Sequence, residues 1–326
     1  MNVPIIDPAL SKAQDLLNHL RKEIGKHIIG QEHLIERLLV TIFSGGHLLL
    51  EGVPGLAKTR TLSVLSRLVS GQLSRIQFTP DLLPSDLIGT EVYRPQSGDF
   101  SVRKGPIFAN ILLADEINRA PAKVQSALLQ AMQEHQVTIG EHTFALPEPF
   151  MVLATQNPIE QEGTYRLPEA QLDRFLMKVE VTYPSLEEEL RVVELVSQPS
   201  GENPEIKPIL SLEQISELRK IAASTYCDSK IDRYIVSLVH ATRDASAYGL
   251  SGMIEWGASP RASIALKIGA RTLAFLRGKT FVTPDEVKAL APDVLRHRIL
   301  PSFDAEARSL TNNALIETLL RSVPTP

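Results

Sequence analysis

The sequence predicts an α/β domain with a five-stranded parallel sheet, followed by a smaller domain built from helices. Short apolar runs alternate with helical patterns over residues 1–195, and this alternation is typical of a parallel sheet that helices cover on both faces. Residues 196–204 are rich in turn-forming residues and indicate a linker. In 205–326 the apolar residues recur at helical spacing almost throughout.

Each expected strand is a short apolar run, and the five runs are His47–Leu50, Ile76–Phe78, Ile111–Ala114, Phe150–Ala154 and Lys178–Thr182. Helical patterns cover 11–26, 31–43, 58–69 and 124–134 before the linker, and 211–224, 228–245, 259–277, 283–291 and 304–321 after it. Thr283 and Pro284 precede two acidic residues, which predicts a helix that begins there with Thr283 as its cap.

Composition limits the classes of function. The 34 basic and 38 acidic residues give a formal net charge of −4, so charge gives no reason to expect a dedicated nucleic-acid-binding protein. Cys227, the single cysteine, cannot form an internal disulfide and is expected to be a buried small apolar residue. The first thirty residues lack the apolar core of a signal peptide. We expect a cytoplasmic protein that does not span a membrane.

A phosphate-binding loop is expected after the first strand. Lys58 and Thr59 end the run Gly52-Val53-Pro54-Gly55-Leu56-Ala57-Lys58-Thr59, which lies between a strand and a helix as the G-x-x-x-x-G-K-[ST] motif requires. In that motif the lysine reaches the phosphates of the nucleotide and the threonine hydroxyl ligates Mg²⁺. We count Arg60, the next residue, in the same ATP-binding set. The alternative is a chance Gly/Pro turn before a helix.

Two carboxylates follow the third apolar run. A buried strand would deliver Asp115 to the metal, directly or through water, and Glu116 could then polarise the attacking water as a general base. Taken alone, the pattern also fits acidic residues that cap the end of a strand. The two carboxylates lie at the end of another expected strand that follows the phosphate loop in the sequence, and this position favours ATP hydrolysis.

Two further polar residues follow in order. Asn157 ends the next run, and a carboxamide at that strand end can orient the lytic water; a plain Asn-Pro turn is the alternative. Arg174 lies in the sequence Leu172-Asp-Arg-Phe175. The sequence alone assigns Arg174 no phosphate partner in its own chain. A surface ion pair is the alternative to a role in the site.

Together these motifs resemble those of the AAA+ ATPases, and within them those of the MoxR family. The resemblance extends from about residue 28 to the end, and its carriers are Glu51–Thr59, Asp115–Pro121, Gln125–Glu134, Ala154–Pro158 and Glu162–Phe175. Ala57 stands where the G-x-x-x-x-G-K-[ST] motif has its second glycine, and that family commonly has alanine at this position. The resemblance implies that the chain binds ATP with Mg²⁺ and hydrolyses it.

The resemblance implies a role for each matching residue. The segment Ile29-Gly30-Gln31 resembles the one that contacts adenine, and Asn157 resembles the sensor of the γ-phosphate. Arg174 resembles the arginine finger, which acts on the nucleotide of the neighbouring subunit. Arg261 resembles the second sensor, acting on its own or a neighbour's nucleotide; a surface arginine at a helix start is the alternative.

The segments 86–106 and 136–146 resemble two β-hairpins of this clade: an insert in the second helix and a hairpin before the sensor strand. The resemblance implies that both face the pore of a ring, a hexamer, and touch a client protein. It implies a chaperone-like remodeller that acts on a separate client; similar proteins often act alongside a partner with a von Willebrand A domain. The alternatives are a nucleic-acid motor, for which Arg103 and Lys104 are a local hint, and a nucleotide-gated scaffold with little turnover.

Overall fold

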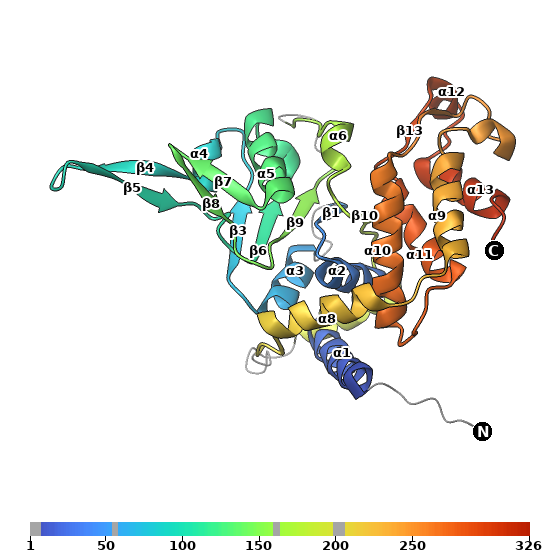
Figure 1. Cartoon of the computed structure of the whole chain (residues 1–326), viewed down its shortest axis with the longest axis horizontal. Helices are drawn as coiled ribbons and strands as arrows, with labels where there is room; N and C mark the ends of the chain where they lie inside the picture. The colour runs from blue at the N-terminus through green and yellow to red at the C-terminus, as the bar shows by residue number, and fades with distance from the viewer. Residues whose placement is uncertain (1–7, 54–57, 159–163, 198–205) are drawn as a thin grey trace. The chain divides into compact units, whose positions relative to one another are not determined.

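The computed structural model describes residues 8–53, 58–158, 164–197 and 206–326 (Figure 1). It divides into two compact units. The α/β unit comprises 1–38, 47–167 and 179–216, and the helical unit comprises 39–46, 168–178 and 217–326. The segment 168–178, which carries Arg174, therefore belongs to the helical unit although it lies far before the linker in the sequence.

The predicted five-stranded parallel sheet is confirmed, with the strand order β10-β1-β9-β6-β3. Its strands are β1 (Leu48–Glu51), β3 (Leu73–Gln77), β6 (Ile111–Asp115), β9 (Met151–Gln156) and β10 (Met177–Glu180). All residues of β6 and all but the last residue of β1 and of β9 are buried, because parallel strands covered on both faces form continuous apolar runs.

The edge strand β3 differs from the expectation. The run Ile76–Phe78 predicts a buried strand, whereas β3 alternates between exposed and half-buried residues and ends at Gln77. Only Phe78, just after the strand, is fully buried. The physical reason is its position: β3 has one neighbouring strand, β6, so its outer side faces solvent.

The helices of the first 197 residues are α1 (Pro8–His27), α2 (Glu32–Ser44), α3 (Lys58–Arg67), α4 (Pro84–Ile88), α5 (Ala122–Glu134), α6 (Glu169–Leu172) and α7 (Leu186–Ser197). Helix α1 buries Leu17, Leu20 and Ile24 along one face and packs on α3. Of the linker expected at 196–204, the first two residues are the end of α7 and the rest lie outside the described residues.

Two hairpins extend the α/β unit. The strands β4 (Gly89–Arg94) and β5 (Asp99–Lys104) pair along their whole length and reach away from the sheet (Figure 1). The second hairpin consists of β7 (Gln136–Ile139) and β8 (His142–Ala145). The ammonium of Lys104 lies 4.6 Å from the ring centre of Phe108 and 5.4 Å from that of Phe144, so a cation–π contact joins the two hairpins. A small parallel pair joins β2 (Val69–Ser70) and β11 (Leu210–Ser211).

The later helices are α8 (Leu212–Ser224), α9 (Ser229–Ala241), α10 (Pro260–Leu276), α11 (Pro284–Leu295), α12 (Phe303–Ala307) and α13 (Asn312–Ser322). Thr283 caps α11 as predicted, in a capping box with Glu286. The single helix expected at 304–321 is wrong. Ser309 has a left-handed backbone, and the Thr311 side chain caps a new helix by accepting from the Ala314 N–H.

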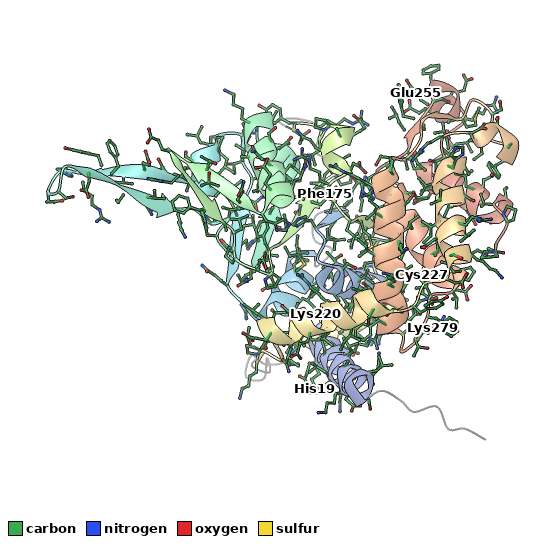
Figure 2. The ribbon with its side chains drawn as sticks, in the orientation of Figure 1. His19, Phe175, Lys220, Cys227, Glu255 and Lys279 are labelled. Atoms are coloured by element: carbon green, nitrogen blue, oxygen red, sulfur yellow. The ribbon has the colours of Figure 1, made fainter. Side chains whose placement is uncertain are left out.

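The strands β12 (Ile254–Trp256) and β13 (Leu300–Pro301) form a short antiparallel pair in the helical unit. Cys227, labelled in Figure 2, lies between α8 and α9. It is half-buried and not fully buried as expected. Its thiol lies 3.5 Å from Asp232 Oδ1, and its partial burial raises the pKa of the thiol. None of the helices in the described part of the chain combines the length and the apolar character that a membrane span needs.

Candidate functional site

The carboxyl ends of four neighbouring strands bring the predicted hydrolysis residues of the α/β unit to one edge of the sheet. Glu51 at the end of β1 is in register with Gln156, and Gln77 at the end of β3 is in register with Asp115. Asn157 follows β9 directly and is buried. Open α/β sheets bind ligands at this edge.

Asp115 is nearly buried, and its charge is compensated by Arg75. Oδ2 lies 2.7 Å from both Nε and Nη2 of Arg75, and Oδ1 accepts a 3.3 Å hydrogen bond from the Thr155 hydroxyl. Carboxylate and hydroxyl oxygens are the ligands that Mg²⁺ prefers, so the donor set at Asp115 fits the expected metal. Because the Arg75 side chain is 56% exposed, it can move away from the carboxylate.

Glu116 has a left-handed backbone, with φ 56° and ψ 51°, a conformation uncommon outside glycine. Its N–H donates to the Thr155 hydroxyl at 2.9 Å, and the turn ends β6 and starts a 3-10 helix at Ile117. Oε2 accepts from Gln77 Nε2 at 2.6 Å and from Arg119 Nη1 at 3.0 Å. Both bonds go to one oxygen, and no donor among the described residues bonds Oε1.

Buried amides support the loops behind these carboxylates. Asn118 Nδ2 donates to the backbone carbonyl of Asn157 at 3.2 Å. The fully buried Gln125 donates to the carbonyls of Ile117 and Tyr165. A buried carboxamide that bonds two backbone carbonyls keeps both loops in one position.

Sequence reasoning missed Arg75, Gln77 and Asn118 as parts of this site. Arg75 and Gln77 occupy alternate positions of β3, and such positions share one face of a strand. That alternation was the available signal, but polar residues at alternate positions are also ordinary for an exposed strand face.

The expected nucleotide-binding segments flank the same sheet edge. Pro54, Gly55, Leu56 and Ala57 lie outside the described residues. Val53 precedes that gap, and Lys58, Thr59 and Arg60 form the first turn of α3. Gly52 needs to be a glycine, because a Cβ there would lie 2.7 Å from the carbonyl oxygen of Val181.

The expected adenine-contacting segment, Ile29 to Gln31, connects α1 and α2. Gly30 and Gln31 both have left-handed backbones, with φ 68° and 59°. A Cβ at Gly30 would lie 2.4 Å from a carboxylate oxygen of Glu188, and Gln31 Nε2 bonds the Thr182 carbonyl at 3.4 Å. The segment therefore packs against the residues that lead into α7.

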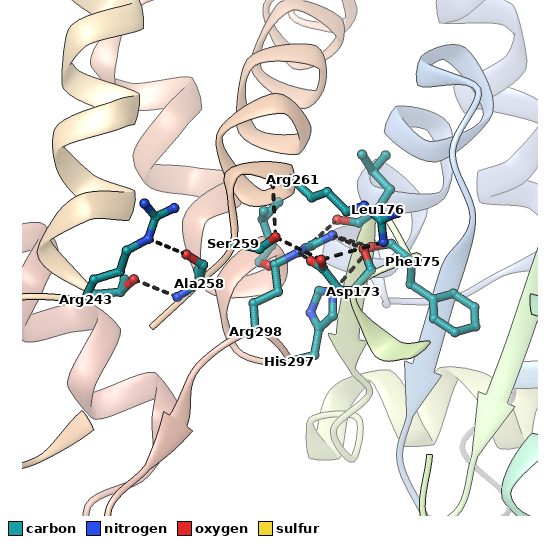
Figure 3. A network of polar contacts seen from close by, with 11 residues as sticks. Asp173, Phe175, Leu176, Arg243, Ala258, Ser259, Arg261, His297 and Arg298 are labelled. Atoms are coloured by element: carbon teal, nitrogen blue, oxygen red, sulfur yellow. Dashed lines mark hydrogen bonds and ion pairs between the residues drawn. The ribbon is translucent and has the colours of Figure 1, made fainter. Parts of the chain in front are cut away.

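In the helical unit, Arg261 lies close to the carboxylate of Asp173, the residue before Arg174 (Figure 3). Arg174 follows Asp173, the residue directly after α6. Arg261 lies in the first turn of α10, where the Ser259 side chain accepts from its N–H. Arg261 Nη1 lies 3.8 Å from Asp173 Oδ2. The expected second sensor is thus ion-paired with the residue before the expected finger.

Comparisons with known proteins show the family to which the chain is related. Residues 47–177 match a family model described as "ATPase family associated with various cellular activities (AAA)", and 247–319 match an AAA lid domain. The chain is 49% identical to Chaperone MoxR1 of Mycobacterium tuberculosis, over 93% of this chain and 81% of that protein. It is 40% identical to the uncharacterized protein YeaC of Bacillus subtilis, over 98% and 96%. A crystal structure from Cytophaga hutchinsonii superposes with a TM-score of 0.91 at 47% identity, covering 98% and 97%.

The burial of His297, the neighbour of Arg298 in the sequence, predicts that the stability of the fold depends on pH. His297 is fully buried, with Nε2 3.3 Å from the Phe175 carbonyl oxygen, and burial, with the charge of Arg298, holds its pKa well below the ordinary value. Below about pH 6.5 the unfolded chain takes up a proton that the folded chain excludes. Above that pH His297 therefore costs no free energy of unfolding, and the free energy of unfolding decreases as the pH falls below it.

Thermal unfolding at pH 7.5 and 5.5 measures this effect. We expect His297→Gln, which keeps an N–H donor but does not titrate, to lose less stability at pH 5.5 than the parent chain. His240→Gln, an exposed position, is the matched control and should follow the parent. Equal pH dependence in His297→Gln and the parent would contradict the assignment.

Proposed function

Because the chain belongs to the MoxR family of AAA+ ATPases, we propose that it hydrolyses ATP and uses the free energy released to remodel partner proteins. The observation that carries the proposal is the pair Asp115 and Glu116 at the carboxyl edge of the sheet. At this edge lie a carboxylate suited to a metal ion, a candidate general base and the first turn of α3. Helix N-termini favour phosphate.

The proposed division of labour follows the contacts. Lys58, Thr59 and Asp115 would hold the phosphates of ATP and Mg²⁺, and the metal supplies positive charge that stabilises the phosphoryl group in transfer. A cation that binds Asp115 has to compete with the Arg75 guanidinium for the carboxylate. Glu116 would take the proton of the attacking water through Oε1, while Gln77 and Arg119 hold Oε2. Asn157 would sense the γ-phosphate.

We place Arg174 in the site of a neighbouring subunit, as the family resemblance implies, in a ring that we expect to be hexameric. A guanidinium that reaches the γ-phosphate stabilises the charge of the transition state. Support for a defined position comes from the turn that carries Arg174: its backbone N–H bonds the Gln171 carbonyl, and the next residue, Phe175, is fully buried.

Exposed apolar residues on the first hairpin support a protein client. Tyr93 and Phe100 are 54% and 67% exposed, and their ring centres lie 5.3 Å apart. Apolar groups gathered on an extended element commonly mark an interaction site. Lys104, one of the two residues that hint at nucleic acid, already packs against Phe108 and Phe144. We therefore favour a protein client, with a von Willebrand A domain partner as an additional proposal from the resemblance.

Glu116→Gln should bind ATP and barely hydrolyse it. Removing the base is expected to lower turnover on the order of 10²-fold or more, because general-base catalysis contributes about 10²–10⁴. Phosphate release and equilibrium binding of a fluorescent ATP analogue measure the two quantities. Glu134→Gln at the exposed end of α5 is the control. Normal turnover in Glu116→Gln would remove Glu116 as the base.

Arg174→Ala should bind ATP and lose turnover, because the finger that it removes serves another subunit. Mixing it with Lys58→Ala should restore activity, since an intact phosphate loop then meets an intact finger. The measurement is ATP turnover across mixing ratios, with each variant alone as the control. A complete lack of recovery at every ratio would count against a site shared between subunits.

Glu116→Gln with ATP should also trap the client, because the ATP-bound state persists. Affinity purification should recover a partner with ATP but not with ADP, and Tyr93→Ala with Phe100→Ala should abolish that recovery. Phe303→Ala, an 81% exposed aromatic of the helical unit, is the matched control. Recovery of the same partner with ADP and with the doubly substituted hairpin would contradict the client assignment.

A further inference from the structure

The turn that carries Arg174 is held by a single buried arginine. Arg298 is 2% exposed and donates through all three of its nitrogens. Nε bonds Asp173 Oδ1 at 2.7 Å, and Nη2 bonds the carbonyls of Asp173 at 3.1 Å and Phe175 at 2.6 Å. Nη1 bonds the carbonyls of Leu176 at 3.2 Å and Val294 at 2.5 Å. Its planar fork thus binds the backbone on both sides of Arg174 (Figure 3).

Asp173 joins this turn to α10. Its Oδ1 is bound by Arg298, while its Oδ2 accepts from the Ser259 hydroxyl at 2.9 Å and faces Arg261 at 3.8 Å. Ser259 is also the cap of α10, and its Oγ accepts from the Arg261 N–H at 3.1 Å. The residue directly before the expected finger therefore contacts the residue expected to act as the second sensor.

The interactions of Arg298 and Arg261 with Asp173 differ in strength. Arg298 is buried and makes five hydrogen bonds, so its removal would take the closest positive charge from the half-buried Asp173 and remove several hydrogen bonds to backbone carbonyls. Arg261 is 48% exposed and lies at 3.8 Å, and exposed ion pairs contribute little. Arg298 is thus a permanent partner, whereas Arg261 can leave for another anion, such as a phosphate.

We propose that Asp173 and Arg298 are positioning residues for ATP hydrolysis, which present Arg174 to the neighbouring subunit's nucleotide, and that Asp173 is the resting partner of Arg261. The proposal rests on the proposed function, because it needs Arg174 to act across a subunit boundary. A phosphate carries more charge than a carboxylate and can accept two parallel N–H bonds from one guanidinium, so Arg261 can exchange Asp173 for phosphate. Arg298 and Ser259 then still hold the turn.

Asp173→Asn tests the proposal, because it keeps the side-chain shape and removes the charge. ATP binding by the variant should be unchanged, since its own phosphate loop is intact, while turnover falls on the order of 10²-fold, the loss expected for a displaced catalytic group. Mixing with Lys58→Ala should restore activity, whereas mixing with Arg174→Ala should not, because every shared site then lacks a well-placed finger. Arg298→Lys keeps the charge but loses the fork, and should behave in the same way.

Asp232→Asn is the matched control. It removes a 2.7 Å ion pair with Lys267 in the same helical unit and should retain the parent's turnover. Three results would overturn the proposal: parental turnover in Asp173→Asn, recovery when Asp173→Asn is mixed with Arg174→Ala, or no recovery with Lys58→Ala. The third would show that the unit is merely damaged. If Arg174→Ala also fails to recover with Lys58→Ala, the shared site itself is wrong, and the positioning role falls with it.

Discussion

The parallel register of the central strands is the constraint on which the candidate hydrolysis site depends. Asp115 and Glu116 acquire defined neighbours because β6 lies between β3 and β9, which brings Arg75 and Gln77 from one side and Thr155 from the other. A shift of one residue in this register would turn every side chain of a strand to the opposite face. Buried apolar residues on β6 and β9 prevent that shift, so the core of the sheet also fixes the chemistry at its edge.

Paired charges recur in both units, with different consequences. Asp115 and Asp173 are each partly or almost wholly buried, and each has an arginine at 2.7 Å. A buried carboxylate without such a partner would be costly. Arg75 is 56% exposed and Arg298 is 2% exposed, so the first arginine can give way to a metal ion, while the second is part of the architecture. Exposure, more than distance, separates an exchangeable contact from a permanent one.

The parts of the fold that could be predicted from the sequence are those that local pattern determines. Apolar runs that end in polar residues indicated the strands and their carboxylates, and Thr283 with Pro284 indicated the start of α11. The contacts of Arg75 and Gln77 depend on strand order, which is not a local property. The break between α12 and α13 contains neither glycine nor proline, so the sequence shows no helix-breaking residue there, and it is Ser309 that takes the left-handed backbone. Arg298 and Asp173 lie 125 positions apart, so no local pattern links them.

The membership of segment 168–178 in the helical unit has a consequence for how such proteins diversify. Exchange of domains between relatives is simplest when each unit is one continuous stretch of chain. Here the helical unit takes 39–46 and 168–178 from within the N-terminal part of the chain, so a recombination point at the linker would separate Asp173 from Arg298. A hybrid joined there inherits Asp173 from one parent and Arg298 from the other, and remains intact only if both parents use the same pair. Segment 168–178 and residues 217–326 are therefore expected to evolve as one block, although the linker separates them in the sequence.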